Sequence, residues 1–559
     1  MTGPADPTGN GTHGGKGGKG GQPRPTEADP ERLRELLLVA GLEVLERDGL
    51  GLGTQALSYR QVFAHLRDRY GVSVARAQVH ERIWTSHDEF RQDVVAATIS
   101  HLPTDLMAPI ADEVRDRVVE QWLLGHPVDQ RITEISRWMA PAAFDVIASL
   151  PALREVQLAK AIATSGGSTL RADELGESLR DRGDSILAGT RSRLTQLTSG
   201  LGLRARRGVV DEGTAQELLG VISINCNVGG FLDVNAGSDD VRRPLALDGL
   251  EADAELPWTM VAVGMISVLR LLFEPDDGPP PSELPEPLPI VDTAPPRIAI
   301  DPTVRRRSRA QLRKLVLAAG VETLLEARLD LRPESLSYAS VFEHLERSRE
   351  VRVYRSSVHR RIWNSHDEYW LDVLTRALQH GAEPDINVLE RLESREPLPV
   401  GSPTERRRAA MGIVRWLTAT DTATSLASSR YLRRQSIKAA LMAEPDAEPF
   451  ASLRQVVHRT GGRRVECLQK VFRSHVLPLG YEVRPERGVD TEEALRILSV
   501  LYLTAAAGAV FDQASGVEPS GRTYPVRFPD MPAPEQWPAI SVATWAVFDH
   551  LFRVRDDTA

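Results

Sequence analysis

The chain has 559 residues, of which 42% are apolar and 26% are charged, and its formal net charge is −9 at pH 7. This length exceeds one ordinary hydrophobic core, so the chain is expected to form several soluble globular domains. The negative net charge excludes indiscriminate binding of polyanions over the whole surface, although it allows a local basic face.

Residues 1–29 are rich in glycine and lysine. Their glycines are neither preceded by a strand pattern nor followed by the Gly-Lys-Ser/Thr of a phosphate loop. Such a segment contains too little apolar surface to offset the entropy of ordering it. We therefore predict a disordered, mildly basic tail.

Residues 30–100 show apolar side chains spaced by three and four, which is typical of amphipathic helices. A first helix is expected over about 31–47, and Ser58 is expected to cap a second. In the following "SVARAQVHERI" (73–83), Ala75, Val79 and Ile83 are expected to face the core. Arg76 and His80 would then lie on the exposed face of a third helix.

A polar and aromatic phrase closes this module. It reads "VHERIWTSHDEF" from residue 79, and Ser86 with Glu89 forms the pattern of a capping box that opens a fourth helix. Three short helices and a connector, with a polar-faced third helix, predict a helix-turn-helix module that can enter the major groove of DNA. Trp84, at the end of the third helix, is expected to pack in the core rather than to contact DNA.

The same phrase returns as "VHRRIWNSHDEY" from residue 358. Positions 57–95 align with 336–374 without gaps and are identical at more than half of the aligned positions, and the likeness extends over the remainder of both halves. Between the halves, ten of the 29 residues in the segment 275–303 are proline, which excludes helix and predicts a linker. The chain beyond the tail is thus a tandem duplication.

The expected organisation is all-α, with about nine helices in each half. A first helix-turn-helix domain (30–100) precedes a first helical regulatory domain (101–274). After the linker (275–303) come a second helix-turn-helix domain (304–380) and a second helical regulatory domain (381–559).

Cys226 and Cys467 are the only cysteines, and they do not occupy matching positions of the repeat. This pattern supports neither a disulfide framework nor a thiolate metal site, and it favours a reducing compartment, the cytoplasm. The most membrane-like run, residues 257–273, is short for a bilayer span and contains Arg270. We expect it to be a buried or interface helix and expect no membrane contact.

The two modules resemble the TetR family of transcriptional regulators, whose third helix and following turn read approximately L-Y-x-H-F-x-S-K-E-x-L. With one residue inserted, the first copy aligns on Val79, His80, Ile83, Ser86, His87 and Phe90, and the second on Val358, His359, Ile362, Ser365, His366 and Tyr369. Ser58 and Arg60 are similar to the family's Thr-x-Arg, whereas the second copy has Ser337 and Ala339. The second helix and the turn are longer than in the family, and Glu350 replaces Gly71.

The resemblance implies two tandem TetR-like halves, each a DNA-binding head followed by a ligand-binding and dimerisation domain. In such proteins the last two helices form a four-helix interface, which here would join residues 213–234 and 257–273 to 491–513 and 537–554. We therefore expect an intrachain pseudo-dimer that represses transcription from an asymmetric operator, with pairing of whole chains as a further possibility.

The expected contacts to double-stranded DNA come from polar and basic side chains of both heads. Arg76 and Arg355 could anchor phosphate or read guanine, although a charged residue on a solvated helix face needs no function. The histidines could contact DNA or simply face solvent. The full set is Ser58, Arg60, Arg76, Gln78, His80, His87, Arg305, Arg306, Arg307, Ser337, Arg355, Ser356, His359, Arg360 and His366.

Other classes of site find less support in the sequence. His65, His80 and His87 recur in the second copy, but no two of them are spaced as a metal-binding pair on one helix, so neither a metal nor another cofactor is expected. No nucleophile elbow, phosphate loop, dinucleotide fingerprint or zinc-protease motif occurs, so we do not expect an enzyme.

The helical domains are expected either to bind a small apolar effector or simply to bury their aromatic side chains as core. The candidates for lining such a pocket are Trp122, Trp138, Met139, Phe144 and Trp416. The alternative to a regulator is a protein-interaction module or antirepressor that has kept the fold and lost DNA binding. The acidic total charge and the atypical turns favour that alternative.

Overall fold

A computed structural model describes most of both halves. The described residues are 30–48, 57–80, 82–101, 108–149, 156–157, 160, 170–235, 240–245, 247, 258–275, 309–326, 336–349, 351–359, 361–380, 401–441, 450–515, 521–529 and 531–555. The described residues are mostly helical with a few short strands, so the expected all-α class is confirmed at this level. The predicted tail lies outside them, as does the predicted linker apart from Pro275.

The first head, residues 30–101, is a small cluster of helices. Ser58 caps its second helix through a capping box with Gln61, as expected, and Gly71 ends that helix at a φ of 66°. The first helix packs on the second and the fourth. The elements are α1 (Pro30–Asp48), α2 (Tyr59–Tyr70), α3 (Arg76–Val79) and α4 (His87–His101).

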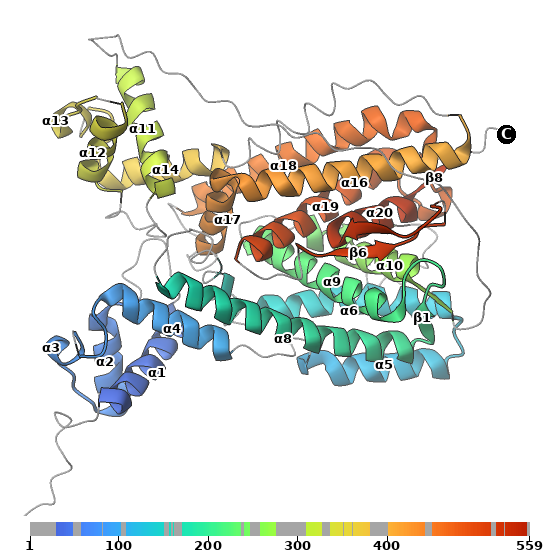
Figure 1. The fold of residues 1–559 in the computed structure, drawn as a ribbon, viewed down its shortest axis with the longest axis horizontal. Helices are drawn as coiled ribbons and strands as arrows, with labels where there is room; N and C mark the ends of the chain where they lie inside the picture. The colour runs from blue at the N-terminus through green and yellow to red at the C-terminus, as the bar shows by residue number, and fades with distance from the viewer. Residues whose placement is uncertain are drawn as a thin grey trace, which may run out of the picture.

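The second head, residues 309–380, repeats this arrangement. Its first helix packs on the second and the fourth, as in the first head. The elements are α11 (Arg309–Glu326), α12 (Tyr338–Arg349), α13 (Arg355–Val358) and α14 (His366–His380). The two heads lie at the same end of the molecule, with α3 and α13 at their tips (Figure 1).

The body of each half is a stack of longer helices whose apolar sides form one core. In the first half the elements are η2 (Ala108–Ile110), α5 (Ala111–Leu123), α6 (Val128–Ser149), α8 (Leu170–Gly200), α9 (Glu212–Asn235), η3 (Asp240–Arg242) and α10 (Met260–Leu272). In the second half they are α16 (Pro403–Ala427), α17 (Ser429–Leu441), α18 (Phe450–His475), η5 (Leu477–Leu479), η6 (Pro485–Arg487), α19 (Thr491–Ala514) and α20 (Ala539–Leu551).

Antiparallel ribbons of two short strands each complete the described part of the body. The strands are too short for an alternating pattern to be recognised in the sequence. In the first half β1 (Leu203–Ala205) pairs with β4 (Phe273–Pro275), and β2 (Pro244–Leu245) pairs with β3 (Trp258–Thr259). In the second half β5 (Tyr481–Val483) pairs with β8 (Phe552–Val554), and β6 (Thr523–Val526) pairs with β7 (Glu535–Pro538). The ribbons therefore repeat with the halves.

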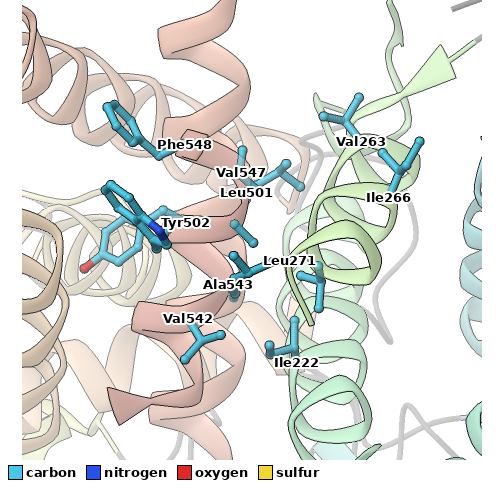
Figure 2. Close-up of a cluster of buried hydrophobic side chains, with 14 of the residues drawn as sticks. Ile222, Val263, Ile266, Leu271, Leu501, Tyr502, Val542, Ala543, Val547 and Phe548 are labelled. Atoms are coloured by element: carbon cyan, nitrogen blue, oxygen red, sulfur yellow. The ribbon is translucent and has the colours of Figure 1, made fainter. Parts of the chain in front are cut away.

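The halves meet through α9, α10, α19 and α20. Helix α9 lies along α19, and α10 lies along α20. Their apolar side chains belong to one buried cluster, in which Ile222 and Leu271 of the first half face Ala543 and Val542 of the second (Figure 2). The expected burial of the apolar run at 257–273 is confirmed by α10, whose Met260, Val263 and Ile266 are at most 1% exposed.

Two glycines permit the close crossing of α9 and α19. A Cβ added to Gly229 would overlap the carbonyl oxygen of Thr504, and one added to Gly508 would overlap the carbonyl oxygen of Asn225. Gly229 and Gly508 occupy matching positions of the repeat, and so do Asn225 and Thr504. The contact is therefore reciprocal, and any side chain at either glycine would push the two helices apart.

Helix α19 is long and apolar enough to cross a membrane by length and composition alone. Its most apolar window is 94% buried inside the protein. The core helix of a folded domain passes the same test, and α19 packs against α9, α16, α18 and α20.

Candidate nucleic-acid interface

Trp84 and Trp363 anchor the two heads from within. Each is 1% exposed, so the prediction that Trp84 packs in the core is confirmed and its counterpart does the same. The indole Nε1 of Trp84 donates to Asp93 at 2.7 Å, and Asp93 also accepts a hydrogen bond from Arg34 at 2.6 Å. Trp363 donates to Asp372 in the same way, at 2.6 Å. Much of the repeated phrase thus specifies a buried hydrogen-bonded core rather than a reading surface.

The histidines of the capped turn also belong to that core. Nε2 of His87 lies 2.8 Å from the carbonyl oxygen of Leu57, and Nε2 of His366 lies 3.1 Å from that of Leu336. Both rings also pack edge-on against a tyrosine, at 4.8 Å for Tyr59 and His87. This geometry does not support the expected contact of His87 and His366 with phosphate, because the Nε2 atoms are engaged inside the head.

The third repeated histidine makes a polar contact that joins the first helix of each head to the second. Nε2 of His65 lies 2.6 Å from Oε2 of Glu43, and His344 and Glu322 make the equivalent contact at 3.1 Å. Burial raises the pKa of Glu43, but hydrogen bonds from His65 and Tyr70 outweigh that effect and lower it. Among the described residues, no group of three or more His, Cys, Asp and Glu side chains could hold a metal ion.

The third helix of each head is much shorter than the sequence suggested. The expected helix over 73–83 is a single turn, Arg76–Val79, and its counterpart is Arg355–Val358. Val79 and Trp84 are both buried, but a continuous helix would place residues five apart about 140° apart around its axis. The chain leaves the helix at His80, with φ −65° and ψ 130°, and turns so that both side chains reach the core.

Because of this turn, two expectations about the residues around the third helix are not met. Ala75, expected in the core, is exposed, whereas Val79 is fully buried as expected, and so is its counterpart Val358. His80 and His359 lie beyond the helix end and are half-buried rather than presented on a helical face. Nδ1 of His359 is buried without a hydrogen-bond partner among the described residues, and its ring packs against Tyr338 at 6.3 Å.

Exposed arginines lie at both tips. Arg76 and Arg355 are exposed at the first position of α3 and α13, and Arg60 is exposed at the start of α2. Burial raises the pKa of Tyr59 and of Tyr338, and Arg76 and Arg355 respectively oppose this shift. The two arginines therefore occupy equivalent places relative to the aromatic core.

Three other predicted residues serve the local backbone. Ser58 and Ser337 accept hydrogen bonds from the backbone at the starts of α2 and α12, and Oε1 of Gln78 accepts from the backbone nitrogen of Ala75 at 2.8 Å. Arg305, Arg306, Arg307 and Arg360 lie outside the described residues, as do the side chains of Ser356 and Trp122.

One exposed aromatic side chain distinguishes the second head. Tyr354 is 67% exposed immediately before Arg355, and the matching position of the first head holds Ala75. Arg352 is also exposed in the second head, where the first head has Ser73. The sequence shows that the two copies differ at these positions. Whether the side chains are exposed depends on the turn that follows the third helix, which the sequence does not show.

The residues proposed to line an effector pocket lie in or against the core. Trp138, Met139 and Phe144 are at most 8% exposed, and Trp416 is half-buried against the same cluster. Arginine side chains cover two of these rings, with Arg117 at 4.3 Å from Trp138 and Arg242 at 5.0 Å from Phe144. A separate half-open pocket of about 220 Å³ contains none of them and is lined by Pro403, Thr404, Arg407, Tyr481, Arg484, Asp549, Arg553 and Val554. Core packing is therefore the favoured interpretation of these residues.

Two ion pairs with buried lysines connect the halves and were not foreseen from the sequence. Lys160 of the first half pairs with Asp512 on α19, and Lys438 on α17 pairs with Asp233 on α9. Asp233 and Asp512 occupy matching positions of the repeat, so the two contacts are reciprocal. Helix α17 also packs on α14 of the second head, which places one ion pair between that head and the interface.

We compared the chain with models of protein families, with curated proteins and with solved structures, and none of the three comparisons found a match.

Proposed function

We propose that the protein is a sequence-specific DNA-binding transcriptional regulator built from two TetR-like halves. The observation that carries this proposal is the placement of two matched heads at one end of the molecule, each with an exposed arginine at its tip, Arg76 and Arg355 (Figure 1). An arginine at such a position can hold phosphate or form a bidentate contact with guanine.

The difference between the tips favours an asymmetric operator. The first head offers Ser73, Ala75 and Arg76, whereas the second offers Arg352, Tyr354 and Arg355. A homodimer of identical heads requires a palindrome, but two different heads joined in one chain can read unlike half-sites about 34 Å apart. We propose that the chain acts as an intrachain pseudo-dimer of this kind.

The contacts between the halves support a ligand-responsive repressor. The glycine crossing of α9 and α19 and the ion pairs Lys160–Asp512 and Lys438–Asp233 constrain how the bodies sit against each other. A ligand that preferred another arrangement of the bodies would change the separation of the heads and so release DNA.

A second candidate function, a protein-interaction module or antirepressor, is favoured by one observation. Helices α3 and α13 have a single turn each, so they present less helical surface to a major groove than the rod expected from the sequence. The net charge of −9 points in the same direction.

Selection of bound duplexes from a random DNA pool, followed by gel-shift titration, tests the proposal. The double variant Arg76→Ala with Arg355→Ala should weaken binding about tenfold or more and reduce the salt slope by roughly one for each arginine that touches a phosphate. Arg115→Ala removes an exposed arginine from α5, away from the heads, and should bind as the natural chain does. Failure to select any sequence, or unchanged affinity of the double variant, favours the interaction module.

Light scattering of the full chain measures the expected intrachain pairing. A mass near the 61.6 kDa of one chain agrees with the pseudo-dimer, and twice that mass means that whole chains pair.

A further inference from the structure

The half-open pocket of the second half lies at the end of the body away from the heads, where α16 begins beside β5, β8 and the end of α20 (Figure 1). Its volume of about 220 Å³ is several times the roughly 30 Å³ that one water molecule occupies in the liquid. The charged residues of its wall are Arg407, Arg484, Arg553 and Asp549. The pocket can therefore hold a small organic molecule, and cations outnumber anions around it.

Two of the three arginines already have carboxylate partners. Arg407 lies 2.9 Å from Asp549, so this pair adds little net charge to the pocket. Nε of Arg553 donates to Glu482 at 3.0 Å, and the same carboxylate accepts a hydrogen bond from Arg555 at 3.2 Å. One carboxylate outside the pocket thus serves two guanidiniums, and the positive charge of this wall is only partly compensated.

Arg484 is fixed in place but leaves the end of its guanidinium unused. Its Nε donates to the carbonyl oxygens of Asp549 at 3.0 Å and Phe552 at 3.1 Å. Its terminal Nη atoms make no hydrogen bond to any described residue, and Nη1 lies 3.6 Å from the Glu486 carboxylate, beyond hydrogen-bond distance. The side chain is 28% exposed. A rigidly held fork of donors is therefore accessible at the pocket.

The matching arginine of the first half is used differently. The ribbons β1–β4 and β5–β8 pair in the same register, so Arg206 corresponds to Arg484. Nη2 of Arg206 donates to the carbonyl oxygens of Arg270 and Phe273 at the end of α10, and its Nε donates to that of Leu271. Closing the end of a helix thus occupies the terminal nitrogen of Arg206 but not those of Arg484.

Further cations lie behind Arg484. Arg487 donates from its Nε to the carbonyl oxygen of His550 at 3.0 Å. Burial lowers the pKa of Arg487 to about 10, and the charges of Arg270 and Arg484 lower it further. These guanidiniums repel one another, and an anion bound to the Nη atoms of Arg484 would reduce that repulsion.

We propose that this pocket binds the carboxylate of a small organic acid, with Arg484 as the main partner of the carboxylate. A guanidinium fork matches the two oxygens of a carboxylate. Pro403, Tyr481 and Val554 provide the apolar part of the wall, against which the hydrocarbon part of the acid would lie. The ligand class therefore differs from the purely apolar effector that the sequence suggested.

The position of the pocket connects it to the contact between the halves. A ligand there would touch the beginning of α16 and the end of α20, and α20 packs on α10 of the first half. Binding would thus restrain elements on which the arrangement of the two bodies depends. An effect of the ligand on DNA affinity rests on the proposed function, whereas the existence of the site does not.

Isothermal titration of the full chain with benzoate and with benzamide tests the proposal. The two compounds share a ring and a similar size, but only benzoate has a carboxylate. At constant ionic strength in chloride, we expect saturable binding of benzoate that is about tenfold or more tighter than that of benzamide. Arg484→Gln should weaken benzoate binding by about tenfold or more, as expected for the loss of hydrogen bonds to a charged group.

The matched control is Arg206→Gln, which removes the corresponding arginine from the first half and should bind benzoate as the natural chain does. A second variant, Thr404→Trp, keeps every arginine but fills the pocket, and it should also lose benzoate binding. Circular dichroism and thermal unfolding establish that each variant is folded.

Three results would overturn the proposal: no saturable binding of benzoate to the natural chain, equal affinities for benzoate and benzamide, or equal benzoate affinities of Arg484→Gln and Arg206→Gln. DNA binding is then measured with and without benzoate. A chain that binds benzoate as expected but binds no DNA shows failure of the proposed function alone.

Discussion

Substitution of Gly508 by alanine tests the central crossing of the two halves. The added Cβ would overlap the carbonyl oxygen of Asn225 and would lie 3.0 Å from the backbone nitrogen of Gly229. Both groups belong to the backbone of α9 and cannot rotate away, so α9 and α19 must separate. Overpacking of this kind costs about 1–3 kcal/mol, and a backbone obstacle should place the cost near the top of that range.

The intrinsic helix preference of alanine acts in the opposite direction. Replacing glycine inside a helix contributes up to about 1 kcal/mol, so a net loss of about 1–2 kcal/mol is expected for Gly508→Ala. Gly412 lies inside α16, and a Cβ there would meet nothing within 4 Å. Gly412→Ala should therefore stabilise the chain by up to about 1 kcal/mol.

Urea unfolding followed by tryptophan fluorescence and circular dichroism measures both effects as shifts of the midpoint. Gly229→Ala should resemble Gly508→Ala, because the contact is reciprocal. The reasoning is refuted if Gly508→Ala unfolds at the same urea concentration as Gly412→Ala, or at a higher one.

Three further predictions concern buried polar groups. Trp84→Phe removes the hydrogen bond to Asp93 and should destabilise the first head by about 1–2 kcal/mol. Hydrogen exchange should therefore become faster in α1 and α4 of that head but not in α11 and α14 of the second, and equal exchange in both heads would contradict this. Burial lowers the pKa of Lys438 from 10.5 to about 8, so between these pH values the unfolded chain binds more protons than the folded chain. The free energy of unfolding should therefore rise by about 3 kcal/mol as the pH rises through that window. Lys438→Met should remove that rise, and an unchanged slope would show that another group is responsible. Burial holds the pKa of His550 well below 6.5, and the nearby Arg487, Arg270 and Arg484 lower it further. The free energy of unfolding should therefore fall as the pH drops below 6.5, and His550→Gln should flatten that decline. Identical acid-unfolding profiles of the variant and the natural chain would refute the assignment.

Local features of the fold could be read from the sequence because they depend on neighbouring residues. Apolar spacing predicted the helices, and the cap at Ser58 follows from a serine placed before an amphipathic run. The ungapped repeat predicted that both heads would share one structure, and the matched contacts of Trp84 and Trp363 confirm that likeness. The candidate interface was harder to predict from the sequence, because the length of α3 depends on where the Trp84 side chain is buried.

The interior of the second half shows why periodicity alone misleads. In "YLRRQSIKAAL", the charges of Arg433, Arg434 and Lys438 are typical of a solvated helix face, yet all three are buried. The spacing of residues in a helix indicates which of them lie on the same side. It does not indicate whether that side is buried, because the helices that cover it come from distant parts of the chain. The burial of Lys438 depends on α9, whose Asp233 lies 205 residues earlier.

The sequence by itself determined that this protein is helical, duplicated and equipped with two capped heads, because caps and amphipathic spacing act within a few residues. Only the tertiary structure decided that glycines form the crossing between the halves, that lysines and aspartates pair across it, and that two arginines lie inside. Those outcomes depend on the distance and angle at which whole helices pack, and no short stretch of sequence specifies either quantity.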